Sequence, residues 1–364
     1  MDQAAHDAFL AACQQMMRHR QVFAKPKIEQ FILDHVDAST HNLDLMAHIV
    51  AESLIKRLDR ELVESRNIYV EQFDIPQIQL FYMMARAYPQ IDASHAIANH
   101  GLAWAAADCE AVTLLDIGIG KGRQASALVE QLADWPGRRT RRLHVVAVDP
   151  DPQNLEDSAV ALHRVARGLP IEVTYAPVGG LVEKLPRHFY ATLGAETGGA
   201  LVINAAYTLH HTTHRPYAPL GRTALLRRLA DTRPRLISLV EPSADHDTEN
   251  LGRRFHNCWW HFGTVFDLID EAPLSAAERF VIKEKFFGRE IRDLFGVSDR
   301  HRCERHEPCA TWLLRLHRAG FVPAAAPTPA LTLPAYCDVT VDEGLVRLGY
   351  RGMNLISVML QRPR

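Results

Sequence analysis

The residues with the clearest chemical meaning form a glycine-rich loop, Asp116-Ile-Gly118-Ile-Gly120-Lys-Gly122, which follows a short apolar run. Glycines let the backbone approach a ligand closely, because no Cβ stands in the way. An acidic residue before the first glycine would repel a pyrophosphate and favour a cationic ligand. The dinucleotide fingerprint also needs a third glycine where this chain has Arg123. The loop therefore predicts S-adenosylmethionine, which carries an ammonium and a sulfonium group but no phosphate.

A second acidic residue stands where the next apolar run ends. Asp149 follows Val148 directly, and a carboxylate at this place can accept hydrogen bonds from both hydroxyls of a ribose. We expect the adenine to lie beside the end of the third run, near Pro177 and Val178. The alternative is a glycine turn that holds no ligand, with Asp149 capping the next helix.

Five polar side chains that follow strand ends are candidates for contacting a methyl acceptor: Asn204, His210, His211, Glu241 and His246. A neutral histidine or a carboxylate could remove a proton from an amine or hydroxyl acceptor near pH 7. Each candidate also has a structural alternative: Asn204 as a cap, the histidines as donors within the fold, and Glu241 as the partner of an arginine. The group formed by His210, His211 and His214 has no cysteine or carboxylate at ligand spacing, so we expect no metal there.

Short apolar runs separated by helical lengths predict the elements that position these residues. Such runs are typical of buried parallel strands in an α/β sheet, and they are Val112–Ile117, Leu143–Val148, Ile171–Tyr175, Ala200–Ala205 and Leu236–Val240. Five strands of this kind make a doubly wound sheet, which binds ligands at the carboxyl ends of its strands. A helix over Cys309–Arg318 and an antiparallel pair, Leu345–Gly349 and Leu355–Leu360, complete the predicted domain.

The first 110 residues differ, because their apolar residues recur at helical spacing and show no strand-like alternation. We therefore expect an N-terminal helical cap over residues 1–110 and a core over residues 111–364. No strand pattern appears between about residues 242 and 300, so this stretch is expected to be a helical insertion that joins the cap.

Composition excludes several classes of protein. A formal net charge of -2 over 364 residues provides no basic field for phosphate backbones, so we expect no nucleic-acid partner. No apolar run in the sequence approaches the about 20 residues that a membrane helix needs, and the N-terminus lacks the apolar segment of a secretory signal. The cysteines are scattered without a CxxC pair, which favours reduced thiols. We expect a soluble, cytoplasmic protein without a membrane partner.

Segments spread over nearly the whole chain resemble motifs of the GRAS-domain family. Ser94 to His100 resembles the stretch before the family's VHIID motif, and Leu114 to Gly118 stands in the place of that motif. The other matching segments are Val202 to Asn204 with Leu209 to His211, Leu239 to Glu241 with Asp245, His246, Arg254 and Phe255, Gly288 to Ile291, Glu304 to Glu307, and Trp312 to Phe321. The stretch Gly349 to Leu360 departs from the family pattern, because it lacks the family's tryptophans.

This resemblance implies a Rossmann-like class I methyltransferase sheet with a helical cap subdomain. It also implies two different functions, since plant members are transcriptional regulators with an eroded glycine loop, whereas bacterial members are considered small-molecule methyltransferases. Because the loop is intact here, we expect the bacterial type: an S-adenosylmethionine-dependent methyltransferase whose small-molecule acceptor binds between cap and core. The alternative is a non-catalytic GRAS-like regulatory or ligand-binding protein.

Overall fold

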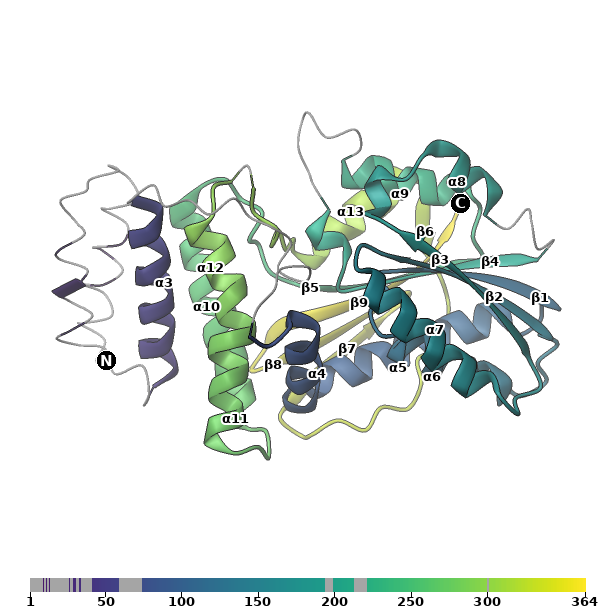
Figure 1. Cartoon of the computed structure of the whole chain (residues 1–364), viewed down its shortest axis with the longest axis horizontal. Coiled ribbons are helices and arrows are strands. Elements are labelled where there is room, and N and C mark those ends of the chain that lie inside the picture. The colour runs from purple at the N-terminus through teal and green to yellow at the C-terminus, as the bar shows by residue number, and fades with distance from the viewer. Residues whose placement is uncertain are drawn as a thin grey trace. The chain divides into compact units, whose positions relative to one another are not determined.

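The computed structural model describes residues 9, 11, 13, 26, 29, 30, 33, 41–58, 74–193, 199–212, 221–299 and 301–364. The chain forms two compact units (Figure 1), and each unit is built from two separate stretches of sequence. The helical unit comprises Met1–Tyr88 and Ala244–Glu307, and the sheet unit comprises Pro89–Ser243 and Pro308–Arg364. His214, from the predicted histidine group, lies outside the described residues.

The sheet unit is built on one mixed sheet with the strand order β3-β2-β1-β4-β5-β9-β8-β7, in which β6 pairs with β9. The bounds are β1 Ala111–Ile117, β2 Arg142–Asp149, β3 Glu172–Gly179, β4 Ala200–Ala206, β5 Leu236–Pro242, β6 Phe321–Pro323, β7 Cys337–Asp342, β8 Leu345–Tyr350 and β9 Met353–Pro363. Strands β1 to β5 are parallel, and the later strands join antiparallel. The carboxyl ends of the first five strands therefore meet at one edge of the sheet.

Helices cover both faces of this sheet (Figure 1). One layer holds α8 Arg187–Thr192, α9 Arg222–Asp231 and α13 Cys309–Ala319; the other holds α5 Pro89–Ala106, α6 Arg123–Ala133 and α7 Pro152–Ala166. Buried side chains of the first layer, such as Leu226 and Trp312, join one core with Leu115 and Ile203 of the strands. Burial on both faces explains why the strand sequences are continuously apolar.

Helix α5 packs in the sheet unit, although the expected cap extended to residue 110. A Cβ atom at Gly101 would lie only 2.8 Å from Leu360 Cδ1 of β9, so the glycine lets the helix approach the strand. The Ser94 and Tyr207 hydroxyls, 2.6 Å apart, tie the same helix to the end of β4. The helical unit consequently ends its first stretch at Tyr88.

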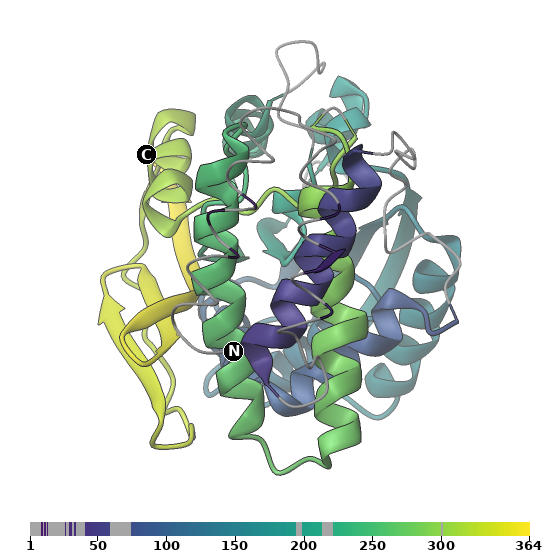
Figure 2. The same ribbon diagram turned by 90° about the vertical axis from the view of Figure 1, so that its left-hand side faces the viewer.

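The helical unit contains α3 Asn42–Leu58, α4 Gln77–Ala87, α10 Leu251–Asp270, α11 Ala276–Val281, a π-helical turn Ile282–Phe287 and α12 Gly288–Gly296. Helices α3 and α12 lie side by side (Figure 2), and a Cβ at Gly288 would come within 3.3 Å of Ile49 Cδ1. Helix α11 begins with a capping box between Ser275 and Glu278. The interior is aromatic, since Phe255, Phe262 and Phe266 of α10 are fully buried.

The mixed α/β class predicted from the apolar runs is confirmed, as is the antiparallel pair near the end of the sequence. Strands β6 and β7 were not predicted. Strand β7 exposes most of its side chains, so its sequence carries no apolar run that marks it as a strand. Within the part of the chain that the structure describes, no helix is both long and apolar enough to cross a membrane.

Candidate functional site

The glycine-rich loop joins β1 to α6, and its three glycines adopt left-handed backbone conformations. The φ angles of Gly118, Gly120 and Gly122 are 75°, 53° and 75°, a region that residues with a Cβ rarely adopt. Two of these positions also have close neighbours from the same chain. A Cβ at Gly118 would lie 2.5 Å from Thr208 Oγ1, and one at Gly122 would lie 2.9 Å from Ser158 Cβ. The turn and its own packing therefore require these two glycines, whether or not a ligand is present.

Asp149, the predicted ribose ligand, is buried at the end of β2 and holds the loop against the start of α7. Its Oδ2 accepts the Gly120 N–H at 3.0 Å. Its Oδ1 accepts the Asp151 N–H at 2.9 Å and the Asn154 side-chain amide at 3.2 Å. Burial raises the pKa of Asp149, and these three hydrogen bonds oppose that rise. A carboxylate has about four acceptor sites, so one remains for a ligand hydroxyl rather than the two expected.

Asp116 ends the neighbouring strand and is also buried. Its Oδ1 accepts a hydrogen bond of 2.9 Å from the Asn204 side-chain amide. Burial raises the pKa of Asp116 to about 7, the nearby Asp149 charge adds to the rise, and the Asn204 hydrogen bond opposes it. The carboxyl group is thus balanced between its neutral and charged forms near neutral pH, and a nearby cation would favour the charged form.

Two residues that sequence reasoning missed extend this group. Gln124 Nε2 donates to Asn204 Oδ1 at 3.2 Å and also reaches Asn99 Oδ1 at 3.2 Å. Asn99 in turn donates to the Gln124 carbonyl at 3.0 Å. Asn204 was predicted to contact an acceptor, but here its amide bridges Asp116 and Gln124. Asn99, Gln124 and Asn204 are far apart in sequence, so no local pattern could have joined them.

Tyr207 is a second missed feature, because it has a left-handed backbone with φ of 54° despite being a tyrosine. Such a conformation is strained for a non-glycine residue and persists only where neighbours hold it. The Ser94 hydroxyl, 2.6 Å away, and the Val240 carbonyl, which accepts the Tyr207 N–H at 2.8 Å, hold this one. The turn brings Thr208 against Gly118.

Pro177 and Val178, the two residues expected beside the adenine, lie on the strand next to Asp149. Val178 pairs with Val148, the residue that precedes Asp149 on β2. Val178 packs against the buried core, whereas Pro177 is exposed. Both belong to β3, the outer strand of the sheet on this side.

Glu241 and His210 form a buried pair within the sheet unit. Glu241 is fully buried; its Oε1 accepts the Leu209 N–H at 2.7 Å, and its Oε2 lies 2.6 Å from His210 Nδ1. The buried Arg222 side chain donates to the His210 carbonyl at 2.6 Å. His211 is half-buried, with its ring 3.9 Å from that of His210. These contacts hold the short 3₁₀ turn Leu209–His211 against the end of β5.

His246 belongs to the helical unit, unlike the other four predicted substrate contacts. Its Nδ1 lies 3.0 Å from His306 Nδ1, and its ring stacks on Phe262 with 5.3 Å between centroids. The predicted set is therefore divided between two units, with Asn204, His210, His211 and Glu241 in the sheet unit.

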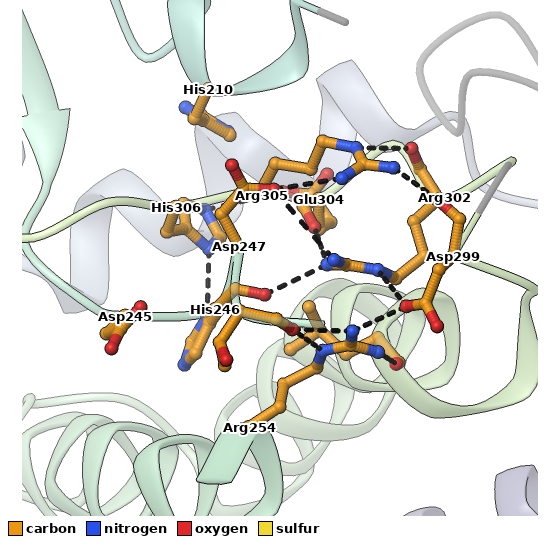
Figure 3. A network of polar contacts seen from close by, with 12 residues as sticks. His210, Asp245, His246, Asp247, Arg254, Asp299, Arg302, Glu304, Arg305 and His306 are labelled. Atoms are coloured by element: carbon orange, nitrogen blue, oxygen red, sulfur yellow. Dashed lines mark hydrogen bonds and ion pairs between the residues drawn. The ribbon is translucent and has the colours of Figure 1, made fainter. Parts of the chain in front are cut away.

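A buried ionic network organises the loops of the helical unit (Figure 3). Arg305 pairs with Asp247 at 2.9 Å, and Arg302 pairs with Asp299 at 3.2 Å. The fully buried Arg254 also pairs with Asp299, and it donates to the backbone carbonyls of Thr248 and Leu294. A guanidinium that donates both to carboxylates and to backbone carbonyls fixes the position of the backbone segments that it contacts.

Comparison with known proteins shows the family of this chain and its similarity to several plant proteins. The model of the GRAS domain family matches residues 8–332. Protein SLENDER RICE1-LIKE 1 of Oryza sativa subsp. japonica is 26% identical over 349 residues, covering 89% of this chain and 70% of that protein. Scarecrow-like transcription factor PAT1 of Arabidopsis thaliana is 22% identical over 328 residues, covering 87% of this chain and 66% of that protein. Across eight plant relatives, the match covers 37% to 70% of the length of each.

A solved structure shares the fold over the full length. The crystal structure of SCL7 in Oryza sativa aligns with a TM-score of 0.79 at 18% identity, covering 99% of this chain and 100% of that one. Solved structures described as methyltransferases align with TM-scores of 0.35 or less, so their likeness carries no conclusion about activity.

These comparisons overturn the main functional prediction. The relatives are plant GRAS proteins, one of them named a transcription factor, and not small-molecule methyltransferases. The expectation of a bacterial-type methyltransferase is wrong, and the expected small-molecule acceptor is wrong with it. The physical reason lies in the glycine loop: Thr208 and Ser158 account for Gly118 and Gly122, so an intact loop does not by itself indicate catalysis.

Proposed function

Because the chain belongs to the GRAS domain family, we propose that it is a non-catalytic regulatory protein whose sheet unit binds an adenosine-type ligand at the glycine-rich loop. S-adenosylmethionine is the first candidate for that ligand. One observation carries the ligand part of the proposal: the buried carboxylates of Asp116 and Asp149 flank the loop at the ends of adjacent parallel strands. The regulatory part follows from the relatives, which include a protein named as a transcription factor.

The strand order supports this location. The order β3-β2-β1-β4-β5 is that of a Rossmann-like doubly wound sheet, which binds ligands where the order reverses. In this chain the reversal lies between β1 and β4, where Asp116 pairs in register with Asn204. The finer assignment as a class I methyltransferase-type sheet is part of this proposal and implies no methyl transfer.

The residues at the loop fit such a ligand. S-adenosylmethionine brings an ammonium and a sulfonium group, and the Asp116 carboxylate would attract both. Asp149 keeps one acceptor site for a ribose hydroxyl. The residues that would hold the ligand are Asp116, Gly118, Gly120, Gly122 and Asp149, with Pro177 and Val178 beside the adenine.

The contacts of Asn204 and Glu241, which were predicted to contact a methyl acceptor, support structural roles for these two side chains. Asn204 is buried and donates to Asp116. Both oxygens of Glu241 contact the turn that carries His210. The Asn204 amide and both oxygens of Glu241 thus each hold another part of the sheet unit in place.

Calorimetric titration of the full chain with S-adenosylmethionine, its demethylated product and adenosine tests the proposal. We expect saturable heat with S-adenosylmethionine and a loss of at least tenfold in affinity for Asp149→Asn. Asp134→Asn, which changes an exposed carboxylate at the end of α6, should bind like the unchanged protein. No heat at millimolar ligand would contradict the ligand part. Methyl label that moves from S-adenosylmethionine into a product of a heat-inactivated cell extract only when the purified protein is added would contradict the non-catalytic part.

A further inference from the structure

Three side chains of metal-ligand type meet inside the helical unit, which does not contain the glycine-rich loop. One ligand atom each from Glu290, Glu304 and His306 lies within 4.8 Å of the other two. Their exposed fractions are 8%, 0% and 2%. The group is therefore no surface patch of acids, which would be solvated without any ion.

Two separate elements bring the group together. Glu290 stands in the first turn of α12, whereas Glu304 and His306 belong to the segment that follows this helix. Asp293 of α12 ties the two, because its Oδ2 accepts the backbone N–H groups of Cys303 at 2.9 Å and Glu304 at 2.7 Å. The backbone that presents Glu304 is thus fixed against the helix that presents Glu290.

The His306 ring is oriented from both sides. Its Nε2 lies 3.3 Å from Glu304 Oε2, and its Nδ1 lies 3.0 Å from His246 Nδ1. The rings of His246 and His261 pack edge to face at 5.3 Å. Histidines that bind metals have their second ring nitrogen held by another group, which fixes the tautomer and the ring plane. His246 stands in that position toward His306.

The arginines nearby hold a different pair of carboxylates. Arg302 and Arg305 contact Asp247 and Asp299, and Arg302 reaches Glu304 through the backbone carbonyl at 2.8 Å. Figure 3 shows Glu304 among these arginine side chains, with His306 nearby. The arginine network therefore holds the backbone of Glu304, which presents one carboxylate of the group.

We propose that Glu290, Glu304 and His306 bind one Zn²⁺ ion, with His306 coordinating through Nε2. Two carboxylates neutralise a divalent ion, and an imidazole ligand favours a transition metal over Mg²⁺ or Ca²⁺. Zinc bonds to oxygen and nitrogen of about 2.0–2.2 Å place tetrahedral ligand atoms roughly 3.4 Å apart, so small side-chain rotations would close the site. The ion would fasten α12 to the segment after it, and water would complete the coordination.

The proposal does not depend on ligand binding at the glycine-rich loop, because all its residues lie in the helical unit. Its test is calorimetric titration of the chelator-treated full chain with ZnCl₂, and separately with MgCl₂. We expect one Zn²⁺ per chain with a dissociation constant in the micromolar range or below, a higher melting temperature with zinc, and no saturable heat with millimolar Mg²⁺. Saturation by Mg²⁺ alone would overturn the choice of metal.

Variants assign the ligands. Glu290→Gln and Glu304→Gln should each weaken zinc binding at least tenfold. Glu307→Gln removes an equally buried carboxylate of the same segment and should bind zinc as the unchanged protein does. Equal loss in all three variants, or full retention in Glu290→Gln, would overturn the assignment. If Glu304→Gln fails to fold, X-ray absorption spectroscopy of the zinc-bound unchanged protein decides, because a spectrum without the scattering pattern of an imidazole ligand contradicts the site.

Discussion

Each unit contains a buried aspartate whose pKa is raised to about 7, yet the two aspartates are held differently. In the sheet unit, burial raises the pKa of Asp116, and its hydrogen bond comes from the side chain of Asn204. In the helical unit, burial and the Glu304 charge raise the pKa of Asp293, and backbone N–H groups of Cys303 and Glu304 bond to it. A side-chain partner can turn toward a ligand, whereas backbone partners hold a loop. This difference fits the ligand role that we propose for Asp116 and a structural role for Asp293.

The largest expected effect tests the structural role of the helical unit's network. Arg254→Met should lower the free energy of unfolding by about 2–4 kcal/mol, because it leaves the buried Leu294 carbonyl and the part-buried Thr248 carbonyl without their donor and removes one of the arginines that contact Asp299. Urea unfolding followed by circular dichroism measures it. Arg253→Met, at an adjacent exposed position, should change stability by about 0.5 kcal/mol or less. A loss below about 1 kcal/mol for Arg254→Met would mean that the network contributes little to the fold.

The next effect concerns the glycine loop of the sheet unit. Gly118→Ala should lower the free energy of unfolding by more than Gly137→Ala, although both glycines have left-handed backbones. Alanine at Gly137 meets no atom within 4 Å and suffers only the backbone strain of about 1–2 kcal/mol, whereas alanine at Gly118 also overlaps Thr208. Thermal unfolding of both variants measures the difference. Equal losses would show that the Thr208 side chain moves aside at little cost. If the Gly118→Ala loss is larger, adding Thr208→Gly to that variant should recover the difference.

The third prediction concerns pH. The Asp116 pKa is about 7 in the folded chain against a usual value of 3.8, so the folded state keeps a proton that the unfolded state loses. The contribution of Asp116 to the free energy of unfolding is therefore fully present below about pH 4. It declines as the pH rises from about 4 to about 7, and it is lost above about pH 7. Asp116→Asn should remove this decline, so that the variant gains stability relative to the unchanged protein at pH 8 but not at pH 4. Melting temperatures at both pH values would reveal the difference, and a gap of the same size at both would contradict the raised pKa.

The smallest effect probes the strained turn. Tyr207→Phe removes the hydroxyl that meets Ser94 and should cost about 0.5–1.5 kcal/mol, the usual value of one hydrogen bond. A double-mutant cycle with Ser94→Ala would isolate this contact in urea unfolding. Additive losses would mean that the two hydroxyls do not interact.

The positions of Asp116 and Asp149 could be predicted from the sequence, because both stand where continuous apolar runs end. The amide chain from Asp116 through Asn204 to Gln124 could not, since its members are brought together by strand order rather than by spacing. The same holds for His246, which stands only five residues after Glu241 but packs with Phe262 and His306 in the helical unit.

The prediction of methyltransferase activity from an intact glycine loop is wrong for a different physical reason. Glycine is required wherever a backbone adopts a positive φ or another chain segment comes close, and both causes act at Gly118 and Gly122. A ligand is a third cause that gives the same sequence pattern. Only a structure distinguishes a glycine that faces Thr208 or Ser158 from one that faces open space, as Gly137 does.

The place of β9 in the sheet has a consequence for how the chain must fold during synthesis. This strand is translated after every other strand, yet it lies between β5 and β8 rather than at an edge. Until residues 353–363 have left the ribosome, β5 has an open edge and the β7–β8 hairpin has no sheet to join. Open strand edges recruit other chains, so we expect the nascent sheet to be prone to aggregation until β9 closes it.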